Sequence, residues 1–192
     1  AVVESTMTTI GGRNQILVRL PDGTIRGIDG MTQVPMGYDP DTAPQAAYGY
    51  PVVGIPGAVA GLMRLHGEYG SLPLATVMAP AIDYAENGFR LLPGEALRQA
   101  FGARQSKEFP ATAAIYLHPD GTPRVPGEML VNKDYAETLT QIAAGGHDAF
   151  YKGEIAQKIA ADMAAHGSTL TLESLAQYRA EDFQGKVTLE AK

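Results

Sequence analysis

The chain has 192 residues, of which 45% are hydrophobic and 19% charged, with a formal net charge of −6 and no cysteine. This length allows one domain with a sizeable core, and the apolar fraction is ordinary for a globular protein. A net negative charge without clustered Lys and Arg argues against nucleic-acid binding. No apolar run approaches the roughly 20 residues that a membrane-spanning helix needs. We therefore expect neither a nucleic-acid nor a membrane partner, and the lack of cysteine excludes disulfides and thiolate metal sites.

The N-terminal part of the chain predicts a β-hairpin. Asn14–Leu20 and Thr24–Asp29 are strand-like, and Pro21-Asp-Gly23 joins them. Proline presets the first dihedral of a turn and glycine can adopt a positive φ, so this tripeptide favours a tight reversal between the strands.

Residues 31–55 are predicted to form a long loop, because their many prolines and glycines interrupt any regular element. Tyr38, Tyr48 and Tyr50 lie in this loop. We expect them to anchor it by burying their rings, and a role facing the substrate is the alternative.

From residue 56 onward the chain is predicted to be mainly helical. Pro56 suits the first turn of a helix in which Val59, Leu62, Met63 and Leu65 share a buried face. A second helix is expected to follow.

Ser71 can cap the second helix, with Pro73 in its first turn. Pro80 should break this helix into two pieces, because proline lacks an N–H and clashes with the preceding turn. Asn87-Gly88 is a natural C-terminal stop.

Three further helices are predicted from their start and stop signals. Asn132 can cap the first, which Gly145-Gly146 would end; Gly167 closes the second, and Thr171 caps the third. The expected organisation is a single domain in three parts: a β-hairpin in residues 1–30, a loop in 31–55 and a mainly helical region in 56–192.

The residues show little chemistry of their own. The four histidines have no short metal-ligand spacing, and neither a Gly-x-Ser-x-Gly elbow nor a phosphate-binding loop occurs. Gly11-Gly12-Arg13 could direct N–H groups toward an anion, although two glycines before a strand are more typical of a tight turn. Carboxylates such as Asp83 and Glu86 are expected to be solvated. We therefore expect no cofactor, no metal site and no catalytic residue in this chain.

Several short motifs nevertheless occur in a characteristic order. They are Gly54-Ile-Pro-Gly-Ala-Val-Ala-Gly61, Glu86-Asn-Gly-Phe89, Phe150-Tyr-Lys-Gly153 and Leu175-Ala-Gln-Tyr178. Together they resemble the large subunit of the γ-glutamyltransferase (γ-glutamyltranspeptidase) family of N-terminal-nucleophile (Ntn) hydrolases. The resemblance extends over nearly the whole chain.

The resemblance implies an α+β fold, a four-layer αββα sandwich that a second, smaller subunit completes. That partner would begin with a catalytic Thr released by self-cleavage of a precursor. The Thr hydroxyl would attack a small-molecule amide, with its own α-amino group as the base and backbone N–H groups holding the oxyanion. Ala1 has no hydroxyl, and Thr8 and Thr9 are internal, so the nucleophile is not expected in this chain.

One motif departs from the family pattern. Where members carry Asp-x-Arg-Glu-x-Ala-Pro, this chain has Asp29-Gly-Met-Thr-Gln-Val-Pro35. The family's Arg pairs with the substrate's α-carboxylate, whereas Met31 cannot donate a hydrogen bond and Thr32 replaces the Glu. Arg13 also replaces a family Gly. We therefore expect Met31, Arg13 and Thr32 to be substrate-binding residues.

Two interpretations of this departure remain. In the first, which we favour, the enzyme cleaves another amide, as the cephalosporin-acylase-like relatives do. In the second, Arg13 or Arg26 takes over the substrate anion. A different class of function is also open: an inactive relative that acts as a binding or scaffold subunit.

The family pattern extends beyond this chain, with a helix before it and a Ser-Ser-Gly-Gly segment after it. The chain is therefore expected to be the middle of a longer large subunit. Residues 1–10 have neither a basic start nor an apolar stretch, so a signal peptide is expected to be absent or already removed. The resemblance implies a periplasmic or secreted location, and a cytoplasmic one stays open.

Overall fold

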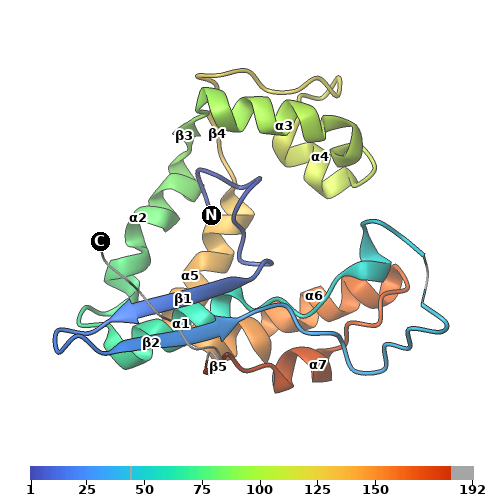
Figure 1. The fold of residues 1–192 in the computed structure, drawn as a ribbon. Coiled ribbons are helices and arrows are strands. Elements are labelled where there is room, and N and C mark those ends of the chain that lie inside the picture. The colour runs from blue at the N-terminus through green and yellow to red at the C-terminus, as the bar shows by residue number, and fades with distance from the viewer. Residues whose placement is uncertain (44, 183–192) are drawn as a thin grey trace, which may run out of the picture. The chain divides into compact units, whose positions relative to one another are not determined.

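The computed structural model describes residues 1–43 and 45–182. Helices joined by loops make up most of it, together with small antiparallel sheets, so the expected α+β class is confirmed (Figure 1). In chain order the elements are β1 (Asn14–Arg19), β2 (Ile25–Gly30), the 3₁₀ turn η1 (Tyr50–Val52), α1 (Ala58–Tyr69), α2 (Leu74–Asn87), β3 (Phe89–Arg90), α3 (Pro93–Ser106), α4 (Pro110–Tyr116), β4 (Met129–Leu130), α5 (Lys133–Tyr151), α6 (Glu154–Ala165), α7 (Leu172–Gln177) and β5 (Glu181–Asp182).

The chain forms two compact units. One joins residues 1–9 to 73–144, and the other joins residues 10–72 to the chain from Gly145 onward. The division falls within α5, next to Gly146, whose φ of 57° and ψ of −139° lie outside the helical region. The predicted stop at Gly145-Gly146 therefore marks a real break, after which helical turns resume as far as Tyr151. The single-domain organisation stays a prediction.

The predicted hairpin is present in the second unit. β1 and β2 pair antiparallel from Asn14↔Gly30 to Arg19↔Ile25, and Gly23 takes a φ of 88° in the connecting turn. The hairpin also gains a third strand, which the sequence analysis missed. β5 adds to the outer edge of β2, giving the order β1-β2-β5. This strand spans two residues, too few to show an alternating pattern.

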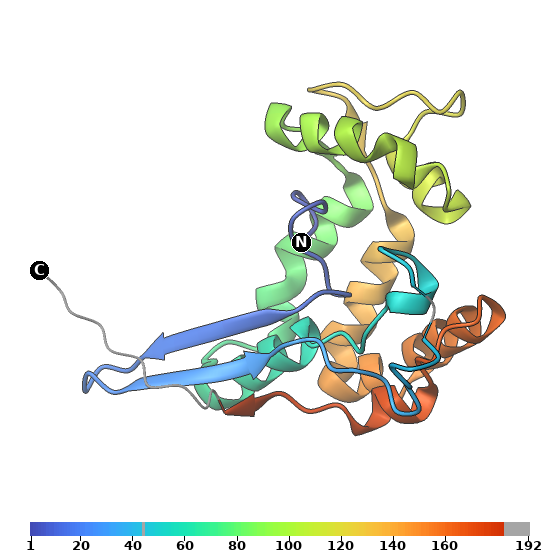
Figure 2. The ribbon, with the colours of Figure 1, turned by 45° about the vertical axis from the view of Figure 1, so that its right-hand side comes forward.

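Helix α1 packs against this sheet, as Figures 1 and 2 show. Its buried residues are all in the first turn: Ala58, Val59, Ala60 and Gly61. The expected buried face is therefore confirmed at Val59 and wrong at Leu62, which is 46% exposed, while Met63 and Leu65 are half-buried. The small side chains of the first turn allow the helix to approach the strands closely, which a row of leucines would prevent.

Helix α2 departs from the prediction at both proline signals. It runs unbroken from Leu74 to Asn87 with Pro80 inside it, and Pro73 rather than Ser71 occupies the N-cap position. Pro80 lies on the exposed side, where water can bind the carbonyl that loses its intrahelical partner. The predicted stop is confirmed, since Gly88 has a φ of 86°.

The first unit contains two helices that the sequence analysis did not predict. α3 and α4 both begin with a proline, Pro93 and Pro110, which is a favourable first helical residue. The core beside them contains Phe89 and Leu130, paired between β3 and β4, together with Leu91 and Ala96.

The predicted helix caps are confirmed by hydrogen bonds. Asn132 Oδ1 accepts from the N–H of Tyr135 at 3.0 Å, and Thr171 Oγ1 accepts from the N–H of Ser174 at 3.1 Å. Gly167 follows α6 with a φ of 75°.

The tyrosines of the loop behave differently from one another. Tyr50 stacks on His166 with ring centroids 4.0 Å apart, which anchors the loop to the end of α6. Tyr38 and Tyr48 are 41% and 46% exposed, so the expectation that all three rings are buried is wrong.

A buried carboxylate ties the N-terminal residues to α3. Glu95 is 1% exposed and accepts hydrogen bonds from Ser5 Oγ at 3.1 Å, Thr6 N–H at 3.1 Å and Thr6 Oγ1 at 2.6 Å. Gln99 Nε2 and Arg98 also donate to it, at 3.1 and 3.0 Å. Burial raises the pKa of Glu95, but the bonds from Thr6, Gln99 and Arg98 outweigh this effect and hold the pKa below its usual range.

We predict that this carboxylate makes the first unit acid-sensitive. Because the pKa of Glu95 is lower in the folded state, its stabilising effect is complete above the unfolded pKa of about 4.3 and is lost as pH falls through the folded value. Glu95→Gln should lower the free energy of unfolding by about 1–3 kcal/mol at pH 7. The difference in the free energy of unfolding between wild type and Glu95→Gln should become smaller below pH 4, as measured by urea unfolding. Glu86→Gln, on the exposed side of α2, is the control, and a deficit independent of pH would contradict the prediction.

Candidate functional site

The described residues offer no metal centre. Within residues 1–43 and 45–182, His, Asp and Glu side chains nowhere gather in a group of three that could hold a metal ion. In the same part of the chain, every helix is too short or too polar to cross a membrane.

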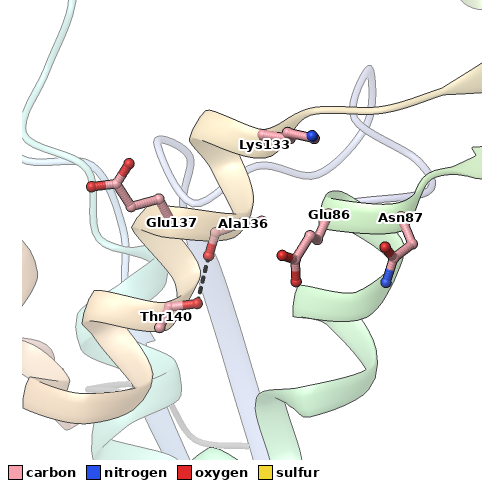
Figure 3. Close-up of a pocket in the computed structure, with 6 residues that line it drawn as sticks. All are labelled: Glu86, Asn87, Lys133, Ala136, Glu137 and Thr140. Carbon is pink, nitrogen blue, oxygen red and sulfur yellow. Dashed lines mark hydrogen bonds between the residues drawn. The ribbon is translucent and has the colours of Figure 1, made fainter.

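A cavity of about 350 Å³ lies in the first unit, between the end of α2 and the start of α5 (Figure 3). Its lining is Glu86, Asn87, Lys133, Ala136, Glu137 and Thr140. All of these except Ala136 are exposed, so the cavity is an open, solvated groove. None of the predicted substrate-binding residues lines it.

The predicted residues gather instead at one end of the hairpin. Asn14 pairs with Gly30 at the last position of the β1–β2 register. Arg13 comes directly before β1 and Met31 directly after β2, so the two residues flank this terminal pair. Thr32 comes next along the chain.

The first turn of α1 is joined to this end of the hairpin through the backbone. The carbonyl of Gly12 accepts hydrogen bonds from the N–H groups of Gly57 and Ala58 at 2.9 and 3.0 Å. Asn14 Nδ2 donates to the carbonyl of Ala58 at 2.8 Å. A side chain at Gly57 would collide with the carbonyl of Gly30, so this approach requires glycine.

Both backbone polar groups of Met31 are bonded. Its N–H donates to Asp29 Oδ1 at 2.9 Å, and its carbonyl accepts from the phenol of Tyr178 at 2.7 Å. The Met31 side chain takes part in neither bond, and the residue is half-buried. The backbone of Met31 is thus fixed independently of what its side chain contacts.

The loop that follows Met31 is closed at its base. Gln33 and Ile55 form a two-way backbone bridge, with N–H to carbonyl distances of 3.3 and 2.8 Å. Thr32 is exposed, and its methyl group fills the space that a Cβ on Gly54 would need. The hydroxyl of Ser174 supports the loop further along, accepting from the N–H of Met36 at 3.1 Å.

The two arginines considered as anion partners lie at different places along the hairpin. Arg13, at the same end of the hairpin as Met31, is exposed, and within the described part of the chain no hydrogen bond or ion pair engages its guanidinium. Arg26 pairs with Val18 in the register. It is five residues from Met31, roughly 16 Å along an extended strand.

Two buried tyrosines lie behind this end of the hairpin, and Tyr178 is the one that bonds to Met31. The sequence analysis assigned neither of them a role. Tyr151 and Tyr178 stack with centroids 5.4 Å apart and are 0% and 1% exposed. Tyr151 donates to the carbonyl of Pro56 at 2.6 Å. Burial, with smaller contributions from the charges of Asp29 and Glu181, raises the pKa of Tyr178 to about 12, so its phenol stays a donor at neutral pH.

The chain belongs to the gamma-glutamyltranspeptidase family, whose model matches residues 1–188. The resemblance that the sequence motifs indicated is therefore confirmed.

Relatives and solved structures agree with this family. A glutathione hydrolase proenzyme of Pseudomonas sp. strain A14 is 33% identical over 95% of this chain and 33% of its own length. The Acylase ACY 1 proenzyme of Pseudomonas sp. strain SE83 is 35% identical over 94% of this chain and 35% of its own length. The crystal structure of Helicobacter pylori gamma-glutamyltranspeptidase is 27% identical, covers 95% of this chain and 55% of its own, and superimposes with a TM-score of 0.90.

The chain thus spans about a third of the length of these curated relatives. It has the fold of the corresponding part of a gamma-glutamyltranspeptidase.

The close contact at Gly57 leads to a stability prediction. Gly57→Ala should lower the free energy of unfolding by about 1–3 kcal/mol, because the new methyl group has no space between Gly30 and Tyr178. Gly67→Ala in the same helix is the matched control. A Cβ there meets nothing within 4 Å, so the change should stabilise the helix by about 0.5–1 kcal/mol. Urea unfolding of both variants tests the contact, and equal effects would refute it.

Proposed function

We propose that this chain is part of the large subunit of an amide-cleaving Ntn hydrolase with altered acyl specificity. The hairpin end that carries Met31, Arg13 and Thr32 would contribute its acyl-binding side. The observation that carries this proposal is the half-buried, backbone-anchored Met31 at the motif position where family members present Arg.

The specificity argument follows from the chemistry of the Met31 side chain. A thioether offers apolar, polarisable contact and no hydrogen-bond donor. A substrate carboxylate placed beside it would lose water without gaining a partner, which is unfavourable. We therefore infer that the preferred acyl group is less polar than γ-glutamyl. An acylase among the relatives, at 35% identity, supports this choice.

Arg13 provides the second interpretation. Its exposed guanidinium lies at the same hairpin end as Met31 and could bind a carboxylate further along a substrate. Arg26 is less suited to this role, because the register puts it several residues up the strand.

The proposed partner is a second subunit that begins with Thr and carries the nucleophile. In the sheet order β1-β2-β5, β1 has a neighbour on one side only among the described strands. Leu17 in β1 is 55% exposed. A free edge with an exposed apolar residue suits pairing with a strand from another polypeptide. We infer that the second subunit extends the sheet from β1.

In the assembled enzyme the Thr hydroxyl would attack the amide carbonyl, and the Thr amine would accept the proton. The protonated Thr amine would give this proton to the leaving amine as the amide C–N bond breaks, which leaves an acyl-enzyme. The acyl group would then pass to water or to an acceptor amine, and the Thr hydroxyl would be restored. The role of this chain would be to hold the acyl group in place for that attack.

The competing function is a binding or scaffold subunit without catalysis. The replacement of both Arg and Glu of the family motif by Met31 and Thr32 favours it. The first residue of the second subunit separates the two functions, since an Ntn hydrolase needs a nucleophile there.

The first test of the proposed function is the acyl preference of Met31 variants. In the processed enzyme, Met31→Arg should raise kcat/KM for a γ-glutamyl anilide at least tenfold and lower it for a butyryl anilide, because a guanidinium can pair with the α-carboxylate. Met31→Leu, which keeps an apolar side chain of similar size, should preserve the wild-type preference.

The alternative to this site is that Met31 fills space in the core. In that case both variants would change the melting temperature while the ratio of kcat/KM for the two anilides stayed constant. That result would show that Met31 does not contact the acyl group.

The second test concerns processing. Mass analysis of the native protein should show a second polypeptide beginning with Thr, and a mechanism-based acylating reagent should label only that residue. A covalent acyl adduct on any Ser or Thr of the present chain would overturn the proposed division of the active site.

A further inference from the structure

We propose that Tyr178 is a positioning residue for substrate selection, which acts by fixing the backbone of Met31. This inference rests on the proposed function of the Met31 segment. Tyr178 follows α7 and is separated from Met31 by 147 residues, yet its phenol donates a hydrogen bond of 2.7 Å to the Met31 carbonyl.

The hydrogen bond from Tyr178 to the Met31 carbonyl is strengthened by its buried surroundings. Tyr178 is 1% exposed, so water cannot readily replace the phenol as the partner of the Met31 carbonyl. A carbonyl left without a partner in such surroundings is costly, and the segment would have to move to reach water. Because the N–H of Met31 is bonded to Asp29, the carbonyl bond means that the peptide units on both sides of the Met31 Cα are held.

The position of Tyr178 is itself well determined. Its ring stacks on Tyr151, and its N–H donates to the carbonyl of Leu175 at 3.1 Å. Just beyond it, Arg64 Nη1 donates to the carbonyl of Ala180 at 3.2 Å. The backbone is therefore hydrogen-bonded at Tyr178 and again two residues later, which limits the positions that the phenol can take.

The phenol also touches the start of α1. A Cβ on Gly57 would collide with the Tyr178 oxygen as well as with the carbonyl of Gly30. Tyr178 thus lies where the hairpin end, the Met31 segment and α1 come together. Removal of its hydroxyl would remove the hydrogen bond to the Met31 carbonyl at this junction.

The expected effect is on substrate binding rather than on the chemical step. Tyr178 is proposed to act through Met31, so it would not touch the nucleophile of the second subunit. In the processed enzyme, Tyr178→Phe should raise KM for the butyryl anilide about five- to tenfold and change kcat less than about twofold. The melting temperature should fall by a few degrees.

Tyr151→Phe is the matched control. Tyr151 is equally buried, shares the same ring stack and donates its phenol to a backbone carbonyl, that of Pro56. Its variant should lower the melting temperature by a similar amount and leave KM within about twofold of wild type. If both variants raise KM equally, the effect is general loosening and the positioning role is wrong.

A combined variant separates this inference from the proposed function. If Met31→Arg alters acyl preference in the wild-type background and the alteration is at least about threefold smaller with Tyr178→Phe, the positioning role is supported. If Met31→Arg is effective and equally so in both backgrounds, the positioning role fails while the proposed site stands. If Met31→Arg has no effect on preference, the proposed site fails, and the role of Tyr178 at that site fails with it.

Discussion

The close approach of Gly57 to Gly30 joins the start of α1 to the end of the β1–β2 hairpin. Neither residue could carry a side chain here, because a Cβ on either would collide with the backbone or with a neighbouring side chain. Gly12 completes the junction by accepting two N–H groups of the first helical turn, which would otherwise lack intrahelical partners. A helix and a sheet usually meet through layers of side chains, whereas here backbone meets backbone.

This junction determines how the Met31 segment is held. With α1 drawn against the hairpin end, the residues that leave β2 have little room there, because the start of α1 and the Tyr178 hydroxyl both lie against this point. The carbonyl of Met31 therefore meets a buried donor, and its N–H turns back onto Asp29. The stack of Tyr178 on Tyr151 extends the same support to α5. The arrangement depends on contacts between residues far apart in the chain.

Local sequence signals predicted the parts of this fold that depend on local physics. Pro21-Asp-Gly23 and the caps at Asn132 and Thr171 each act within a few residues, and each is present. Predictions that depend on the surrounding structure failed. Pro80 was expected to break α2 but is tolerated because it faces solvent. The short strand β5 was not predicted, because it forms only where β2 offers it an edge.

The candidate site shows the same limit of prediction from local sequence. Family resemblance identified Met31, but nothing near residue 31 indicates that its carbonyl is bonded to a tyrosine 147 residues away.

The way Met31 is anchored bears on how a family member could change its substrate. Both hydrogen bonds use main-chain atoms, so neither depends on which side chain residue 31 carries. In the proposed site, a substitution there would alter the chemistry presented to an acyl group while the backbone keeps its position. Arginine and methionine are both long and unbranched near the backbone, so either can occupy a half-buried position without a new cavity. On this argument a change of acyl preference at the proposed site would require a change of side chain and not of fold.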